Sequence, residues 1–203
     1  MKKNVGLKTL LCLSTLLMVP SLYAADVFPK TTLELTSDSG EILGSITPGT
    51  KLTKLDEKSD KSFIVVNGWS AYGENSVIFQ NIGQRVVYAL LKPTAFKSIE
   101  KGASKTDDYD AEWVQSQIKG WVKNSDLTSN QKDVWNEGEK LFGERCGSCH
   151  QAHPSDEFTV NQWPNIVKAM KDRAGLLPEQ QWQLTKYMQA HAKDAKQGDD
   201  NAK

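Results

Sequence analysis

Short runs in which apolar and polar residues alternate occupy the chain from about residue 31 to residue 127. In the first run, Thr31 to Thr36, side chains alternate with a period of two, and Asp38-Ser39-Gly40 behind it is typical of a turn. Pro48-Gly49 marks a second turn. The other predicted strands cover residues 41–47, 50–55, 62–66, 69–72, 76–79, 85–91 and 118–122. Strands this short and this regularly spaced predict a small antiparallel β-barrel.

One stretch, Lys92 to Glu112, breaks the alternation. It is polar and ends in the acidic run Asp107-Asp108-Tyr109-Asp110, so we predict a long exposed loop. An acidic docking patch is an alternative interpretation, although charge runs usually form a solvated face.

Beyond residue 130 the apolar positions change to helical spacing, and three segments carry such a stripe. The first is Val134, Trp135, Gly138, Leu141 and Phe142, with Ser129 as the predicted N-cap. The second is Trp163, Ile166, Val167 and Met170, with Pro164 in the first turn, where proline is tolerated. The third is Leu184, Tyr187, Met188 and His191, opened by Pro178-Glu179.

These patterns predict an α+β multidomain protein. Residues 25–127 would form the small antiparallel β-barrel, and residues 128–194 an all-α domain of three helices. The polar residues 195–203 would form a disordered tail. The length of 203 residues is compatible with one or two domains of roughly 100–200 residues each.

The first 24 residues have the composition of a secretory signal peptide. Lys2, Lys3 and Lys8 provide positive charge, and Leu10 to Val19 is a mostly apolar run of ten. A membrane-spanning helix needs about 20 apolar residues, so an uncleaved anchor is the weaker alternative. The run stops at Pro20, and we predict cleavage after Ala24. The protein would then be exported to the periplasm without a stable membrane span.

Composition excludes several classes of protein. The chain has 25 basic and 25 acidic residues, which argues against a nucleic-acid binder because that function needs a basic face. A mean hydropathy of −0.51 excludes a protein with many membrane spans. Beyond residue 24, every cysteine, histidine and methionine lies after residue 145. We therefore expect the chemistry in the last third of the chain.

Residues 146–150, Cys146-Gly147-Ser148-Cys149-His150, form a C-x-x-C-H sequence. This is the attachment motif of c-type haem, in which both thiols bond to the porphyrin and the histidine binds iron. A thioredoxin-like redox pair needs a βαβ context, whereas a helix is predicted before this motif. A zinc site needs a fourth ligand at suitable spacing, and a disulfide over two residues would constrain little of the chain. We predict one covalently attached haem c at Cys146 and Cys149, with His150 as an iron ligand.

The sixth iron ligand has several candidates. His153 follows His150 by three residues, a reach of roughly 11 Å at most, which is too short to pass around the porphyrin edge. Met170 lies twenty residues beyond His150 and is the preferred candidate. Met188, His191 and an open position remain as alternatives. A methionine on an apolar stripe more often only fills a core.

The helical segment resembles a class I cytochrome c, in which the first and last helices cross through a glycine and aromatic residues. Gly138, Phe142 and Tyr187 would make that crossing. In the same family, a methionine shortly before the last helix binds the iron, a position similar to that of Met170. The β region resembles bacterial SH3-like barrels through Lys119-Gly120-Trp121-Val122.

A wider resemblance covers about Thr31 to Lys193. Asn161-Gln162-Trp163, Tyr187-Met188-Gln189 and Ile118-Lys119-Gly120-Trp121-Val122 are similar to the C-terminal region of pentahaem c-type cytochromes of the trimethylamine-N-oxide reductase system. The resemblance implies a quinol-linked multihaem cytochrome as electron donor and a molybdenum reductase as acceptor. Four further C-x-x-C-H motifs of that family, in its membrane-anchored tetrahaem half, do not occur in this sequence.

We therefore expect a periplasmic monohaem c-type cytochrome that carries one electron at a time to a molybdenum N-oxide or S-oxide reductase, or to a similar terminal reductase, and is not an enzyme in itself. The first alternative is a haem-based sensor or regulatory protein with the SH3-like region as its interaction module. The second is a cell-wall binding module.

Overall fold

The computed structural model describes residues 25–147 and 150–196. The predicted signal peptide and most of the predicted tail lie outside the described residues. Within the described residues, no helix is both long enough and apolar enough to cross a membrane.

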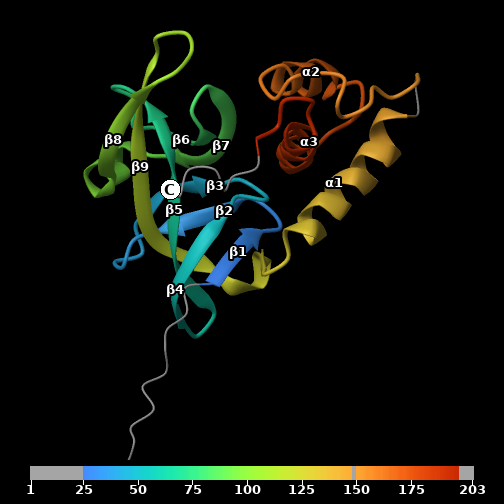
Figure 1. Ribbon diagram of the computed structural model, residues 1–203. Coiled ribbons are helices and arrows are strands. Elements are labelled where there is room, and N and C mark those ends of the chain that lie inside the picture. The colour runs from blue at the N-terminus through green and yellow to red at the C-terminus, as the bar shows by residue number, and fades with distance from the viewer. Residues whose placement is uncertain (1–24, 148–149, 197–203) are drawn as a thin grey trace, which may run out of the picture.

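Ten strands of the described chain form one antiparallel sheet (Figure 1). They are β1 (Ala25–Pro29), β2 (Leu33–Thr36), β3 (Ile42–Ile46), β4 (Leu52–Lys58), β5 (Lys61–Ala71), β6 (Val77–Asn81), β7 (Gln84–Leu91), β8 (Glu100–Thr106), β9 (Glu112–Lys123) and β10 (Leu127–Thr128). Their order is β10-β1-β4-β5-β6-β7-β3-β2-β9-β8. The long strand β9 pairs in addition with β5, from Lys123 opposite Lys61 to Trp113 opposite Ala71. The sheet therefore folds back on itself around its core.

Alternating residues of these strands supply that core. Leu35, Ile46, Ile64 and Ile118 have no exposed surface, as the period-two pattern of their strands requires. Gly120 lets β9 approach β2 closely, because a Cβ atom there would lie 2.7 Å from both the Leu35 Cδ1 and the Thr36 carbonyl oxygen. Any larger residue would push the two strands apart.

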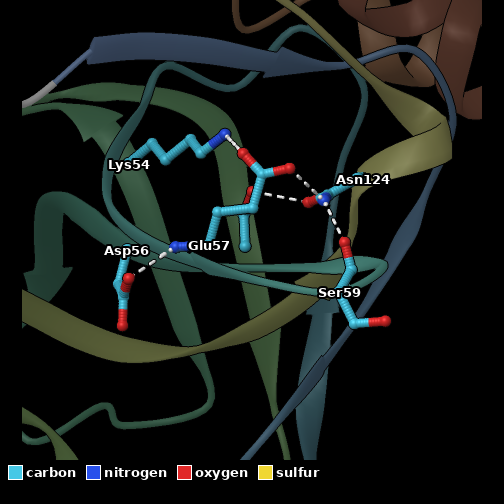
Figure 2. A network of polar contacts seen from close by, with 6 residues as sticks. Lys54, Asp56, Glu57, Ser59 and Asn124 are labelled. Atoms are coloured by element: carbon cyan, nitrogen blue, oxygen red, sulfur yellow. Dashed lines mark hydrogen bonds and ion pairs between the residues drawn. The ribbon is translucent and has the colours of Figure 1, made fainter.

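Asn124 fastens the β4–β5 hairpin to the end of β9 (Figure 2). Its Nδ2 donates to the Glu57 Oε1 at 2.8 Å and to the Ser59 carbonyl at 3.4 Å. The Ser62 hydroxyl donates to the Asn124 Oδ1 at 2.6 Å. Lys54 forms an ion pair with Glu57 on the same hairpin. These bonds hold a turn whose Ser59 adopts a left-handed backbone conformation, with φ of 55°.

In the described part of the chain, three α-helices follow the strands: α1 (Gln131–Cys146), α2 (Trp163–Met170) and α3 (Pro178–Ala190). The three predicted apolar stripes coincide with them, except that His191 of the third stripe is the C-cap of α3. Figure 1 shows the helices gathered beside the sheet, with α1 beginning close to β1, after β10, and α3 lying near β7. The N-cap of α1 is Asn130, not Ser129, because the Asn130 side chain accepts a hydrogen bond from the Lys132 backbone amide.

Helices α1 and α3 cross at Gly138, as the resemblance to class I cytochromes c implied. A Cβ atom at residue 138 would lie 2.5 Å from the Tyr187 Cβ. The ring centroids of Phe142 and Tyr187 are 6.3 Å apart, which extends the contact by about one turn.

The predicted fold class is wrong. The protein is mostly one ten-stranded antiparallel sheet with few helices, not an SH3 barrel followed by an all-α cytochrome c domain. One reason is that strands merge: the runs predicted at 62–66 and 69–72 are the single strand β5. Another is that the helices share their apolar cluster with the sheet, through Val86 of β7. The predicted boundary between residues 127 and 128 stays a prediction.

The predicted loop at Lys92 to Glu112 is also wrong. It contains a 3₁₀-helix, Pro93–Ser98, and the edge strand β8. All residues of β8 are exposed, so this strand has no alternation of apolar and polar side chains by which sequence could have shown it.

Candidate functional site

The predicted haem motif begins where α1 ends. Cys146 is the last residue of this helix, and Gly147 is its C-cap. The Cys146 side chain is half-buried, and burial raises the pKa of its thiol. Cys149 and Ser148 lie outside the described residues. His150 is exposed, and its Nδ1 lies 2.8 Å from the Gln151 carbonyl oxygen.

Cys146 and His150 both line one cavity between α1, α2 and α3. Its volume is about 200 Å³, and most of its wall is apolar. Phe142 comes from α1, Trp163 and Val167 from α2, and Leu184 from α3. Trp163 is almost fully buried, and its Nε1 donates to the Ser155 carbonyl at 2.9 Å, which anchors the loop after His150 against α2.

The candidates for the sixth ligand divide between two places. Met170, at the end of α2, lines the cavity and is 37% exposed, whereas Met188 lines it from α3 and is 1% exposed. His153 also lines it, with its Nδ1 2.9 Å from the Glu157 Oε2. His191 does not line this cavity; its Nδ1 lies 2.8 Å from the Tyr187 carbonyl, beside a second cavity. The structure therefore brings Met170 and Met188, but not His191, to the motif.

The cavity suits a porphyrin in its chemistry. Apolar and aromatic side chains match the faces of the ring, while Arg145 and Arg173 on the same wall match carboxylate groups. Its volume is below the roughly 300–1,000 Å³ of typical ligand cavities. A bound haem would therefore widen the opening or keep one edge outside it. Among the described residues, no group of three or more His, Cys, Asp and Glu side chains is placed to hold a metal ion.

Sequence reasoning missed a second cavity, which lies between the sheet and the helices and holds the buried Lys186. A lysine one residue before the Tyr187-Met188 pair gives no sequence signal of burial, because lysine is almost always exposed.

Comparison with known families gives two matches. Residues 23–127 match the family described as the TorC third cytochrome c domain, and residues 142–203 match one described as dihaem cytochrome c. The first range contains no cysteine, so in this chain the thiols of the C-x-x-C-H motif lie in the second range.

Three curated proteins illustrate the similarity. Cytochrome c-type protein TorY of Escherichia coli O157:H7 is 32% identical over 160 residues, 78% of this chain and 43% of that protein. TorY of Haemophilus influenzae is 28% identical over 169 residues, 83% of this chain and 46% of that protein. Cytochrome c-type protein TorC of Escherichia coli O157:H7 is 26% identical over 178 residues, 86% of this chain and 44% of that protein. The chain thus spans less than half the length of these relatives. No solved structure matches it.

Proposed function

Because the chain belongs to the family of TorC-type cytochromes c, we propose that it is an electron carrier with a single haem c attached at Cys146 and Cys149. The observation that carries this proposal is the meeting of Cys146 and His150 at one apolar cavity. The chain is a carrier rather than an enzyme, and the haem, when bound, supplies the exchange of one electron.

The residues of the chain have separate tasks in this proposal. The His150 imidazole and the Met170 thioether would bind the iron. Phe142 and Trp163 keep water away from the ring. A thioether ligand raises the reduction potential relative to a second histidine, because it favours ferrous iron.

The place of the protein in the cell is part of the same proposal. Residues 1–24 direct export, and the mature protein works in the periplasm. The donor is a quinol-linked multihaem cytochrome, and the acceptor is a molybdenum N-oxide or S-oxide reductase. The resemblance of Thr31 to Lys193 to pentahaem cytochromes of the trimethylamine-N-oxide reductase system supports this assignment, and the relatives TorY and TorC are named as cytochrome c-type proteins.

Covalent attachment tests the proposal directly. We expect the exported protein to stain for haem on a denaturing gel and to gain the mass of one haem. Cys146→Ala should leave at most one thioether bond, and the double variant Cys146→Ala, Cys149→Ala should lose covalent haem. The control is Cys12→Ala, since Cys12 is the third cysteine of the chain and lies within the predicted signal peptide. Absence of covalent haem from the unmutated protein, or its survival in the double variant, would refute the proposal.

One observation favours the sensor as a second candidate: Met170 is more than a third exposed at the cavity rim, where an exogenous ligand has access. Carbon monoxide distinguishes the two functions. A carrier with two fixed ligands should bind it poorly, whereas a sensor with an open iron position should bind it at micromolar concentration.

A further inference from the structure

The second cavity lies on the side of α3 that faces the sheet. It is about 600 Å³ in volume, within the range of typical small-molecule sites. Along α3, Leu184 and Met188 line the first cavity, while Lys186 and Gln189 line this one. The two cavities are therefore separate sites on opposite sides of one helix.

Lys186 is the unusual residue of the second cavity. It is 2% exposed, and its Nζ donates to the Val87 carbonyl at 3.0 Å and lies 4.9 Å from the Tyr88 ring centroid. A charged lysine has three N–H donors, so one carbonyl and one ring face leave a donor without an acceptor. Among the described residues, no carboxylate pairs with Lys186. Burial lowers its pKa to about 7, which shows how little the protein itself compensates the charge.

The rest of the wall carries an excess of positive charge. Lys51, Lys132 and Lys196 line the cavity with Lys186, and Asp26 is the one carboxylate among its described residues. Asp26 already pairs with Lys51, at 3.2 Å. Neither Lys132 nor Lys196 has an acidic partner within the described chain. Phe28 and Trp135 add aromatic surface to the same wall.

We propose that the cavity between β7, α1 and α3 binds a small organic anion. Lys186 holds its anionic group at the buried end, Lys132 and Lys196 attract it at the mouth, and Trp135 and Phe28 contact its apolar part. The anion supplies the acceptor that the third Lys186 donor lacks. This site is independent of the haem proposal, because none of its residues belongs to the C-x-x-C-H motif.

The test follows the Lys186 ammonium by NMR in the full-length exported protein, labelled at lysine. The probes are the organic anions benzoate and succinate, and benzamide is the uncharged control for benzoate. We expect at least one anion to saturate the Lys186 signal at about 10 mM or below and to raise the Lys186 pKa, while benzamide leaves it unchanged. Binding should weaken as pH rises above 7, as Lys186 loses its proton. The other ionisable groups around the cavity are Asp26 and Lys51 near β1 and β4, Tyr88 on β7, Lys132 on α1, and His191 and Lys196 after α3.

Matched variants distinguish anion binding in the cavity from general attraction to surface charge. Lys132→Gln should weaken anion binding by about two- to fivefold, and Lys140→Gln on the same helix should not, because Lys140 is exposed but does not line the cavity. Lys186→Met should weaken it at least about tenfold. If Lys186→Met does not fold, the unmutated protein and the Lys132 and Lys140 variants still decide the question. Failure of both organic anions to saturate the Lys186 signal, or equal weakening by Lys132→Gln and Lys140→Gln, would overturn the proposal.

Discussion

Helix α1 offers a matched pair of substitutions at its crossing with α3. Gly138 faces Tyr187, and a Cβ atom there would lie 2.5 Å from the Tyr187 Cβ and 2.9 Å from its Cγ. Gly143 lies on the same helix with no atom within 4 Å of the Cβ that alanine would add. Gly138→Ala therefore tests the crossing, and Gly143→Ala is its control.

Two opposing contributions set the change in folding stability that each substitution causes. Alanine in place of glycine inside a helix stabilises it by about 1 kcal/mol, and this gain is common to both variants. At residue 138 the new methyl group also overlaps the Tyr187 Cβ, which belongs to the base of its side chain and cannot rotate away. Overpacking of this kind costs about 1–3 kcal/mol. Gly143→Ala should thus be stabilising, and Gly138→Ala should be less stable than it by about 1–3 kcal/mol.

Urea unfolding of the two exported variants, followed by tryptophan fluorescence, measures this difference. Under the haem proposal, Gly138→Ala should also lose the methionine–iron bond at lower urea while the haem stays covalently attached, because α1 carries Cys146 and α3 forms the opposite wall of the cavity. If the two variants shift the unfolding midpoint in the same direction and by the same amount, α1 and α3 do not pack in solution as described.

Met170→Leu should remove the near-infrared charge-transfer band of ferric iron bound to sulfur and lower the reduction potential, whereas Met188→Leu should keep both; the reverse result would identify Met188 as the ligand. Lys186→Met should change how stability depends on pH. Burial lowers the Lys186 pKa from 10.5 to about 7, so the folded protein binds fewer protons than the unfolded chain between those values. Between these two pH values, the free energy of unfolding of the unmutated protein, relative to that of the variant, should rise with pH by at most about 1.4 kcal/mol per pH unit. If urea titrations give a difference in free energy that does not change with pH, Lys186 is not buried in solution. Residues 128–203, exported alone, should still take up haem but unfold at lower urea, because Val86 no longer contributes to the helical cluster; complete failure to take up haem would refute the domain division.

Local pattern was sufficient for the three helices, for most of the strands and for the C-x-x-C-H motif, but not for the exposed edge strand β8. Apolar residues at helical spacing predicted the three helices, and alternation of apolar and polar residues predicted most strands. Both patterns depend only on residues that are close together in the sequence. The crossing at Gly138 was implied by the resemblance to class I cytochromes c, since the three positions by themselves could equally be unrelated apolar residues. Cys146 and His150 could be predicted as site residues because the chemistry of the motif depends on a spacing of a few residues, and the structure places both at one cavity.

Only the tertiary structure decided which elements join. Whether β5 and β9 pair along their full length depends on residues about fifty positions apart, and no local period records that pairing. For the same reason, the sequence did not show that Val86 of β7 packs into the apolar cluster of the helices. The predicted fold class was therefore wrong. The environment of the Lys186 side chain also depends on tertiary contacts that the local sequence does not indicate. A lysine between Thr185 and Tyr187 on a helix is expected in solvent. Its burial, its lowered pKa and the cavity beside it arise only because β7 covers that face of α3.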